Sequence, residues 1–188
     1  MAENFDVRLR PLQASDSARL LAWRNLPDIR RWMYTDHHIP QAEHDLWFAA
    51  ALSDAGRRDW IIEAENEPAG LVSLTGLGSP HRRGTLGYYL ADPALRGRGV
   101  GAFAKHEAIE QGFAVLGLNK LWCEALVDNA ASIGLLESLG FRREALFRAH
   151  VIKAGRPTDV VGLGLLASDW ASCRDGVRDK LRTKGLPL

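Results

Sequence analysis

The sequence predicts an α/β domain in which a mixed, mostly antiparallel sheet carries helices on both faces. Segments with the alternation or the β-branched and aromatic content of strands recur along the chain. Short turns join most neighbouring strands, which favours antiparallel pairing. Helix-like segments separate the other strands and are expected to cover the sheet. A chain of 188 residues, 46% of them hydrophobic, is long enough to bury one core.

The strands are expected where alternating or apolar runs are bounded by turn residues. A polar turn at Glu65–Pro68 makes a hairpin of the second and third strands, and Asp92-Pro93 closes the fourth. A turn around Gly155-Arg156-Pro157 joins the last two. In order, the strands are expected at 5–12, 60–64, 70–77, 82–93, 120–127 and on either side of that last turn within 141–167.

The helices are expected where a capping residue or proline starts a segment and glycine or proline stops it. Ser15 or Asp16 is the expected N-cap of the first helix, which Pro27 stops. Pro40 opens the second and Gly56 ends it. The helices are expected at 13–29, 40–56, 100–116 and 130–140. We expect one domain over 1–168 and a basic tail over 169–188 that forms a short, fraying helix.

Composition excludes several classes of partner. The formal net charge of +1 gives no large field that would attract nucleic acid or a membrane surface. No apolar run approaches the roughly 18 residues of a membrane-spanning helix, and the first residues lack an apolar signal core, so a cytoplasmic location is expected. Cys123 and Cys173 are expected to be free thiols. His37, His38 and His44 lack zinc-ligand spacing, so no metal is predicted.

The stretch "LRGRGVGAFA", Leu95–Ala104, places three glycines and two arginines at the start of a helix. A helix N-terminus leaves N–H groups without partners and carries partial positive charge. Glycines let a ligand approach the backbone closely, so the stretch suits a phosphate group. The alternative is a plain turn before a glycine-rich helix. The pattern matches neither the Walker A motif nor the dinucleotide-binding fingerprint.

The segment Arg96–Gly101 resembles the (Gln/Arg)-x-x-Gly-x-(Gly/Ala) signature of the GNAT superfamily of N-acetyltransferases. The stretch Leu121–Phe141 resembles its second signature, a strand ending in Asn, then a helix and Gly-Phe. The resemblance spans about residues 7–167. It implies a GNAT fold whose fourth and fifth strands are parallel and splay apart to bind acetyl-CoA, with the pantetheine arm along 86–92. The cofactor-binding residues that it implies are Leu90, Arg96, Gly97, Arg98, Gly99, Val100, Gly101, Ala102, Asn129 and Ser132.

Acetyl transfer needs a base to take a proton from the attacking amine. Trp122, Glu124 and Leu126 share one face of the strand at 120–127, and Glu124 lies between large apolar neighbours. In ribosomal-protein N-terminal acetyltransferases of this superfamily, a glutamate five residues before the motif Asn acts as base, and Glu124 matches it. The alternative is a glutamate facing solvent. The resemblance also implies a tyrosine acid seven residues after the Asn, but Leu136 stands there.

The acceptor is expected to bind the stretch Leu21–Phe48, which is rich in tryptophan, histidine and arginine. Packing of two helices on the sheet explains part of this composition. The stretch resembles the N-acetyltransferases of pseudaminic acid biosynthesis, which implies a UDP-4-amino-4,6-dideoxy sugar acetylated at its 4-amino group. Of two tyrosines on the fourth strand, at most one faces the site. The substrate-binding residues predicted are Trp23, Arg24, Asn25, Arg30, Met33, Tyr34, His44, Trp47 and Tyr88.

Three alternatives stay open. The start "LRPL" and the segment "AGRPTDVV" are similar to those of spermidine acetyltransferases. A site for a polycation should be rich in carboxylates, however, and the second expected helix offers only Glu43 and Asp45. Acetylation of a ribosomal protein N-terminus would need an open groove. A non-catalytic acetyl-CoA-binding domain is favoured only by Leu136. Homodimer formation is left open.

Overall fold

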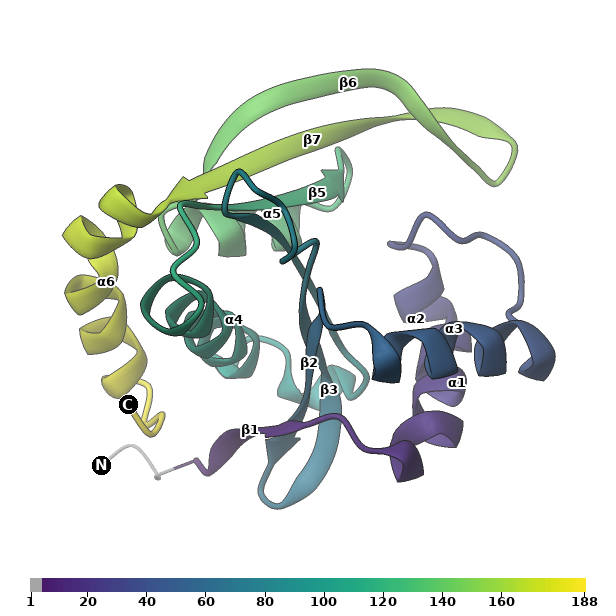
Figure 1. Cartoon of the computed structure of the whole chain (residues 1–188), viewed down its shortest axis with the longest axis horizontal. Helices are drawn as coiled ribbons and strands as arrows, with labels where there is room; N and C mark the ends of the chain where they lie inside the picture. The colour runs from purple at the N-terminus through teal and green to yellow at the C-terminus, as the bar shows by residue number, and fades with distance from the viewer. Residues whose placement is uncertain (1–4) are drawn as a thin grey trace.

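The computed structural model describes residues 5–188, which form a seven-stranded sheet with helices on both sides (Figure 1). The strand order is β1-β2-β3-β4-β5-β7-β6. Neighbouring strands are antiparallel except β4 and β5, which are parallel. The predicted fold class is therefore confirmed. The strands are β1 Val7–Pro11, β2 Arg58–Ala64, β3 Glu67–Thr75, β4 Arg83–Leu90, β5 Lys120–Leu126, β6 Arg142–Lys153 and β7 Arg156–Leu166.

The helices start and stop close to the predicted positions. The first expected helix is divided, because Leu26 takes an extended conformation before Pro27. The third continues as one π-helical turn, Gln111–Val115. The α-helices are α1 Ser17–Asn25, α2 Pro27–Arg30, α3 Gln41–Ser53, α4 Val100–Glu110, α5 Ala130–Ser138 and α6 Ala167–Arg182. None of these helices combines the length and apolar character needed to cross a lipid bilayer, as far as residues 5–188 are concerned.

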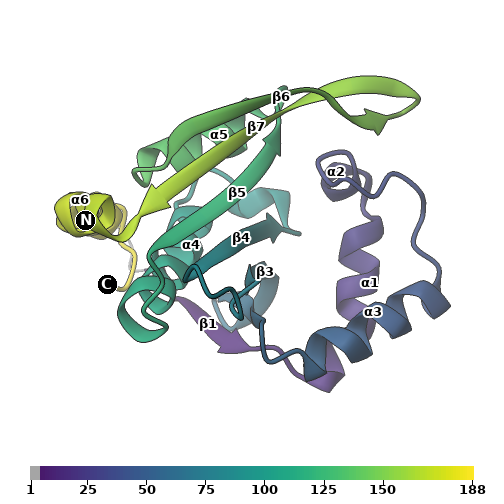
Figure 2. The ribbon, with the colours of Figure 1, turned by 45° about the horizontal axis from the view of Figure 1, so that its top comes forward.

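The helices segregate to the two faces of the sheet (Figure 2). The larger core lies between the sheet and α4, α5 and α6, and includes Val72, Leu121 and Leu163. A smaller core lies between β2–β4 and α1–α3, and includes Leu20 and Ile61. Among residues 5–188, no helix lies beyond β4 on the face that α1–α3 cover, and the α2–α3 segment reaches toward β5 and β7 there (Figure 2). Below, the two faces are called the α4 face and the α1 face.

The parallel strands β4 and β5 separate soon after they begin. Only Arg83–Thr85 pair with Lys120–Trp122. The rest of β4 pairs with β3 alone, and the rest of β5 with β7 alone. The backbone edges of Leu86–Leu90 and Cys123–Leu126 therefore line an opening, which we call the wedge. An unpaired strand edge is able to bond the amides of an extended ligand.

The C-terminal tail differs from its prediction. Helix α6 has 16 residues, and its Trp170, Val177 and Leu181 are buried in the same core as α4. The Trp170 Nε1 donates a 2.6 Å hydrogen bond to Glu110. The tail is an integral layer of the α4 face rather than a fraying end.

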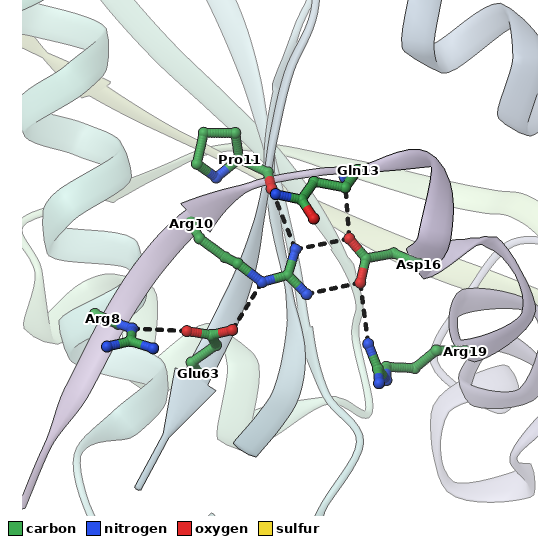
Figure 3. Close-up of polar contacts among 7 residues, drawn as sticks. All are labelled: Arg8, Arg10, Pro11, Gln13, Asp16, Arg19 and Glu63. Atoms are coloured by element: carbon green, nitrogen blue, oxygen red, sulfur yellow. Dashed lines mark hydrogen bonds and ion pairs between the residues drawn. The ribbon is translucent and has the colours of Figure 1, made fainter. Parts of the chain in front are cut away.

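An ion cluster fixes the start of α1 to β1 and β2 (Figure 3). Arg10 donates two hydrogen bonds of 2.7 Å to Asp16 and one of 2.7 Å to Glu63. Asp16, only 1% exposed, also accepts from Arg19 and from the backbone N–H of Gln13, both at 3.0 Å. The hydrogen bonds from Arg10 hold the pKa of Asp16 below its usual value. The cluster thereby positions the helix that carries Trp23 and Arg24.

Candidate active site

The glycine stretch forms a tight loop at the N-terminus of α4. Gly97 and Gly99 have φ of +79° and +89°, a region that favours glycine, and Gly99 is the N-cap residue of α4. A Cβ at Gly101 would lie 2.1 Å from the Tyr88 hydroxyl oxygen, whereas one at Gly97 would meet no atom within 4 Å. The sequence therefore uses glycine for backbone conformation at one position and for close packing at another.

Both arginines of the loop, Arg96 and Arg98, lie at the surface of the protein. Arg96 forms an ion pair of 3.3 Å with Asp28 of α2, and the Arg98 guanidinium lies 3.9 Å from the Phe5 ring centroid. Both side chains stay partly exposed. Together with the helix N-terminus, this positive charge beside the wedge suits a pyrophosphate. The assignment of this loop to a cofactor stays a prediction.

Asn129 and Ser132 lie at the other side of the wedge, at the start of α5. The Asn129 side chain caps the helix by accepting a 3.2 Å hydrogen bond from the Ser132 backbone N–H. Leu90 is buried at the end of β4. The capping role is thus observed, and contact of these residues with a cofactor stays a prediction.

We expect Gly97→Val to weaken acetyl-CoA binding about ten-fold, because the valine would disfavour the positive φ that shapes the loop; one such residue costs about 1–2 kcal/mol. Space is available at Gly97, so the fold should survive. Gly99→Val is a poorer test, because its Cβ would lie 2.7 Å from Leu186. Calorimetric titration with acetyl-CoA measures the effect, and an unchanged Kd would remove the loop from the cofactor site. Gly176→Val, in open space on α6, is the control.

Glu124 projects from β5 onto the α1 face. Its Oε2 accepts a short hydrogen bond from the Tyr34 hydroxyl, and its Oε1 accepts one of 3.3 Å from Trp122 Nε1. Tyr34, in the segment between α2 and α3, is 90 positions away in the chain. Partial burial and the bond to Glu124 raise the pKa of Tyr34, so the phenol stays protonated near neutral pH. The structure thus brings a predicted base and a predicted substrate residue together.

The tip of the hairpin β6–β7 contacts the segment between α2 and α3 that carries Tyr34. Lys153 Nζ donates a 2.7 Å hydrogen bond to the Met33 carbonyl and forms a 2.8 Å ion pair with Asp36. The Ala154 backbone N–H donates a hydrogen bond of 2.7 Å to Asp36. These contacts anchor the segment that carries Tyr34 to the hairpin tip. No prediction from the sequence includes these contacts; a lysine at the last position of a strand before a tight turn is the only local signal of them.

Trp23 and Arg24, two of the predicted substrate-binding residues, lie on the α1 face near β4. Trp23 packs edge-to-face on Tyr89, with ring centroids 6.4 Å apart. Arg24 Nη1 and the Tyr89 hydroxyl are both buried and have no hydrogen-bond partner among residues 5–188. Burial lowers the pKa of Arg24. Buried polar groups without partners are rare in folded proteins, so a substrate-binding role for Arg24 stays a prediction.

Several of the predicted substrate-binding residues make structural contacts, and their role in substrate binding stays a prediction. Asn25 exchanges hydrogen bonds of 2.8 and 2.9 Å with the backbone of Ile39. His44 is buried, shares a 3.1 Å hydrogen bond with Ser17 and stacks on Phe48. These contacts fasten α1, α3 and their connection. The Arg30 carbonyl accepts a hydrogen bond from Lys153 Nζ, and Met33 packs against the smaller core. The Arg57 guanidinium lies over the Trp47 ring.

Tyr88 and Tyr89 lie on opposite faces of the sheet, and the role of Tyr88 in substrate binding stays a prediction. Tyr88 packs on the α4 face against Gly101 and Lys105, whereas Tyr89 lies on the α1 face. Successive side chains of a strand point to opposite faces of the sheet, so the two rings lie on opposite sides of β4. The register of β4 with β3 fixes which ring lies on which face.

A pocket of about 500 Å³ opens on the α1 face where β4 and β5 still pair. Hydroxyl groups of Thr75, Ser79 and Thr85, the cations of Arg83 and Lys120, and the Trp122 ring line it. Trp122, which lines the pocket, also donates a 3.3 Å hydrogen bond to Glu124. The pocket therefore adjoins the predicted base. No group of three or more His, Cys, Asp or Glu side chains able to hold a metal ion occurs in the described part of the chain.

A splayed parallel pair, a glycine loop at a helix N-terminus and a carboxylate on the opposite face fit an acyl-CoA-dependent transferase. The family model described as "Acetyltransferase (GNAT) domain" matches residues 6–142. The chain therefore belongs to the GNAT acetyltransferase family, and acetyl-CoA is the cosubstrate that fits its wedge.

Curated relatives of this chain include spermidine N(1)-acetyltransferase of Escherichia coli K12, 28% identical over 144 residues and covering 77% of each chain. An uncharacterized N-acetyltransferase of Bacillus subtilis, YoaA, is 30% identical over 80% of this chain and 88% of its own. Among solved structures, Vibrio cholerae spermidine N-acetyltransferase in complex with CoA and spermine superposes with a TM-score of 0.81 at 22% identity, over 88% of this chain and 98% of that one. These relatives do not support the predicted likeness to nucleotide-sugar enzymes.

Proposed function

We propose that this enzyme transfers the acetyl group of acetyl-CoA directly to a primary amine in a ternary complex. The observation that carries the proposal is the position of Glu124, a carboxylate on the α1 face beside the wedge. The donor enters from the α4 face and the acceptor from the α1 face. Glu124 takes the proton that the amine loses, either directly or through a water molecule.

We propose spermidine or a related polyamine as the acceptor. The named relatives carry this choice, because two of them act on spermidine. Glu124 supplies a carboxylate for a cationic chain, and no lysine or arginine forms an ion pair with it among residues 5–188. Exposed Asp28 and Asp36 add negative charge on the same side, although each is paired with a cation.

A nucleotide-linked amino sugar is the second candidate. The specific observation in its favour is the unpartnered Nη1 of Arg24 beside Trp23 and Tyr89, since an arginine beside aromatic rings suits a nucleotide better than a polycation. The cations and hydroxyls of the pocket around Thr85 suit the same ligand. This candidate ranks below a polyamine because two of the named relatives are spermidine acetyltransferases.

Release of free CoA thiol tests the choice with three acceptors in parallel: spermidine, a UDP-linked 4-amino-4,6-dideoxy sugar and a peptide with a free N-terminus. We expect the highest kcat/KM with spermidine. The variant Arg24→Gln separates the candidates, because it should spare spermidine and impair a diphosphate-bearing acceptor. Turnover of the sugar above that of spermidine would contradict the polyamine assignment and leave acetyl transfer intact.

A further inference from the structure

Lys105 of α4 carries a buried amine beside Tyr88 of β4. It lies on the sheet-facing side of α4 and is 2% exposed. Its Nζ lies 3.3 Å from the ring centroid of Tyr88 on β4, and Cys123 on β5 is near enough to affect its pKa. Tyr88 and Cys123 both follow the last paired positions, Thr85 and Trp122. The amine is therefore on the α4 face where the strands begin to separate.

No group of residues 5–188 satisfies this amine. Its Nζ has no hydrogen-bond partner, and the Tyr88 ring offers only its face. Burial raises the pKa of Tyr88, and it raises that of Cys123 to about 12, so neither neighbour carries a compensating negative charge. Burial also lowers the pKa of Lys105 to about 7. Buried polar groups without partners are rare, and an apolar residue would pack here at less cost.

Acetyl transfer itself would produce a negatively charged partner for the Lys105 amine, the thiolate of CoA. When the acceptor nitrogen bonds to the acetyl carbon, the carbon–sulfur bond breaks and leaves a thiolate. A thiolate in a desolvated wedge needs a proton or a nearby cation. The side chain at position 136 on α5 is a buried leucine, which donates no proton.

We propose that Lys105 is a catalytic residue that protonates the departing CoA thiolate, an inference that rests on the proposed function. The acceptor nitrogen gives its proton to Glu124 on the α1 face. Lys105 Nζ gives a proton to the sulfur on the α4 face and becomes neutral. The products are the acetylated amine and CoA thiol. After they leave, Lys105 regains a proton from solvent and Glu124 releases one, so that the cycle balances.

The test compares Lys105→Met with the wild type and with Lys180→Met, an exposed lysine of α6. Methionine keeps the length of the side chain and removes the amine. We expect Lys105→Met to bind acetyl-CoA within about three-fold of the wild type by calorimetry and to lose ten-fold or more in kcat. Its melting temperature should not fall, because an unsatisfied buried amine is removed.

The pH dependence of kcat distinguishes proton donation from packing. In the wild type, kcat should fall as the pH rises above about 7, because Lys105 must be protonated to donate. This fall should be absent in Lys105→Met and present in Lys180→Met. A variant with kcat within two-fold of the wild type and the same pH profile would overturn the proposal. Loss of acetyl-CoA binding in the variant would overturn it too, because Lys105 would then be a binding residue. A wild type that binds no acetyl-CoA would overturn the proposed function itself.

Discussion

Replacing Glu124 by glutamine is expected to lower kcat by about ten-fold or more and to leave the KM for acetyl-CoA nearly unchanged. The amide keeps the shape of the side chain and one oxygen that accepts a hydrogen bond, but its NH2 group only donates and it does not accept a proton from the amine. The effect should fall on kcat because Glu124 lies on the α1 face, away from the glycine loop at the start of α4.

Steady-state release of CoA thiol with saturating spermidine measures the effect. Glu67→Gln, an exposed carboxylate at the start of β3, is the matched control and should behave as the wild type. If Glu124→Gln turned over at nearly the wild-type rate between about pH 6 and pH 9, the base would be another group, since a side-chain base contributes on the order of 10²–10⁴-fold.

Replacing Asp16 by alanine is expected to destabilise the fold by about 3 kcal/mol, because it leaves buried positive charge without its partner. Asp16 is 1% exposed and accepts hydrogen bonds from Arg10, Arg19 and Gln13. Urea unfolding of the variant and the wild type measures the difference at pH 7. Asp175→Ala, an exposed carboxylate on α6, is the control and should change the unfolding free energy by less than about 0.5 kcal/mol.

The same cluster predicts how stability depends on pH. Arg10 lowers the pKa of Asp16, and hydrogen bonds from Arg8 and Arg10 outweigh burial to lower that of Glu63. A lowered pKa stabilises the native state above the unfolded-state pKa of about 4, and this stabilisation is lost as the pH falls through the native value. The wild type should therefore lose more stability than Asp16→Ala below about pH 4. Equal losses would show that the cluster contributes little.

Local patterns in the sequence predicted most elements of the sheet and the helices, because caps, prolines and alternation act over a few residues. The splay of β4 and β5 followed from resemblance to a family and not from local pattern. Helix α6 was underestimated because its charged residues dominate its composition. The spacing of Trp170, Val177 and Leu181 on one helical face was the signal that would have shown it packs.

The acceptor side was harder to predict because its contacts join distant segments. Tyr34 and Glu124 are 90 positions apart, and Lys153 and Met33 are 120 apart. No periodicity predicts such pairs. Asn25 and His44 are polar residues in an aromatic-rich stretch, but each is satisfied by a neighbouring segment. Residue type alone does not distinguish such a structural side chain from a ligand-binding one.

The position of acetyl-CoA in the wedge is tested most directly by amide hydrogen exchange of the protein with and without acetyl-CoA. We expect slower exchange at Leu86–Leu90 of β4 and at Gly97–Gly101 of the loop when acetyl-CoA is bound, with the hairpin β6–β7 unchanged. Because β4 pairs only with β3 beyond Thr85, protection there would come from ligand amides along its free edge. Protection confined to β6–β7, or none at Leu86–Leu90, would contradict the account.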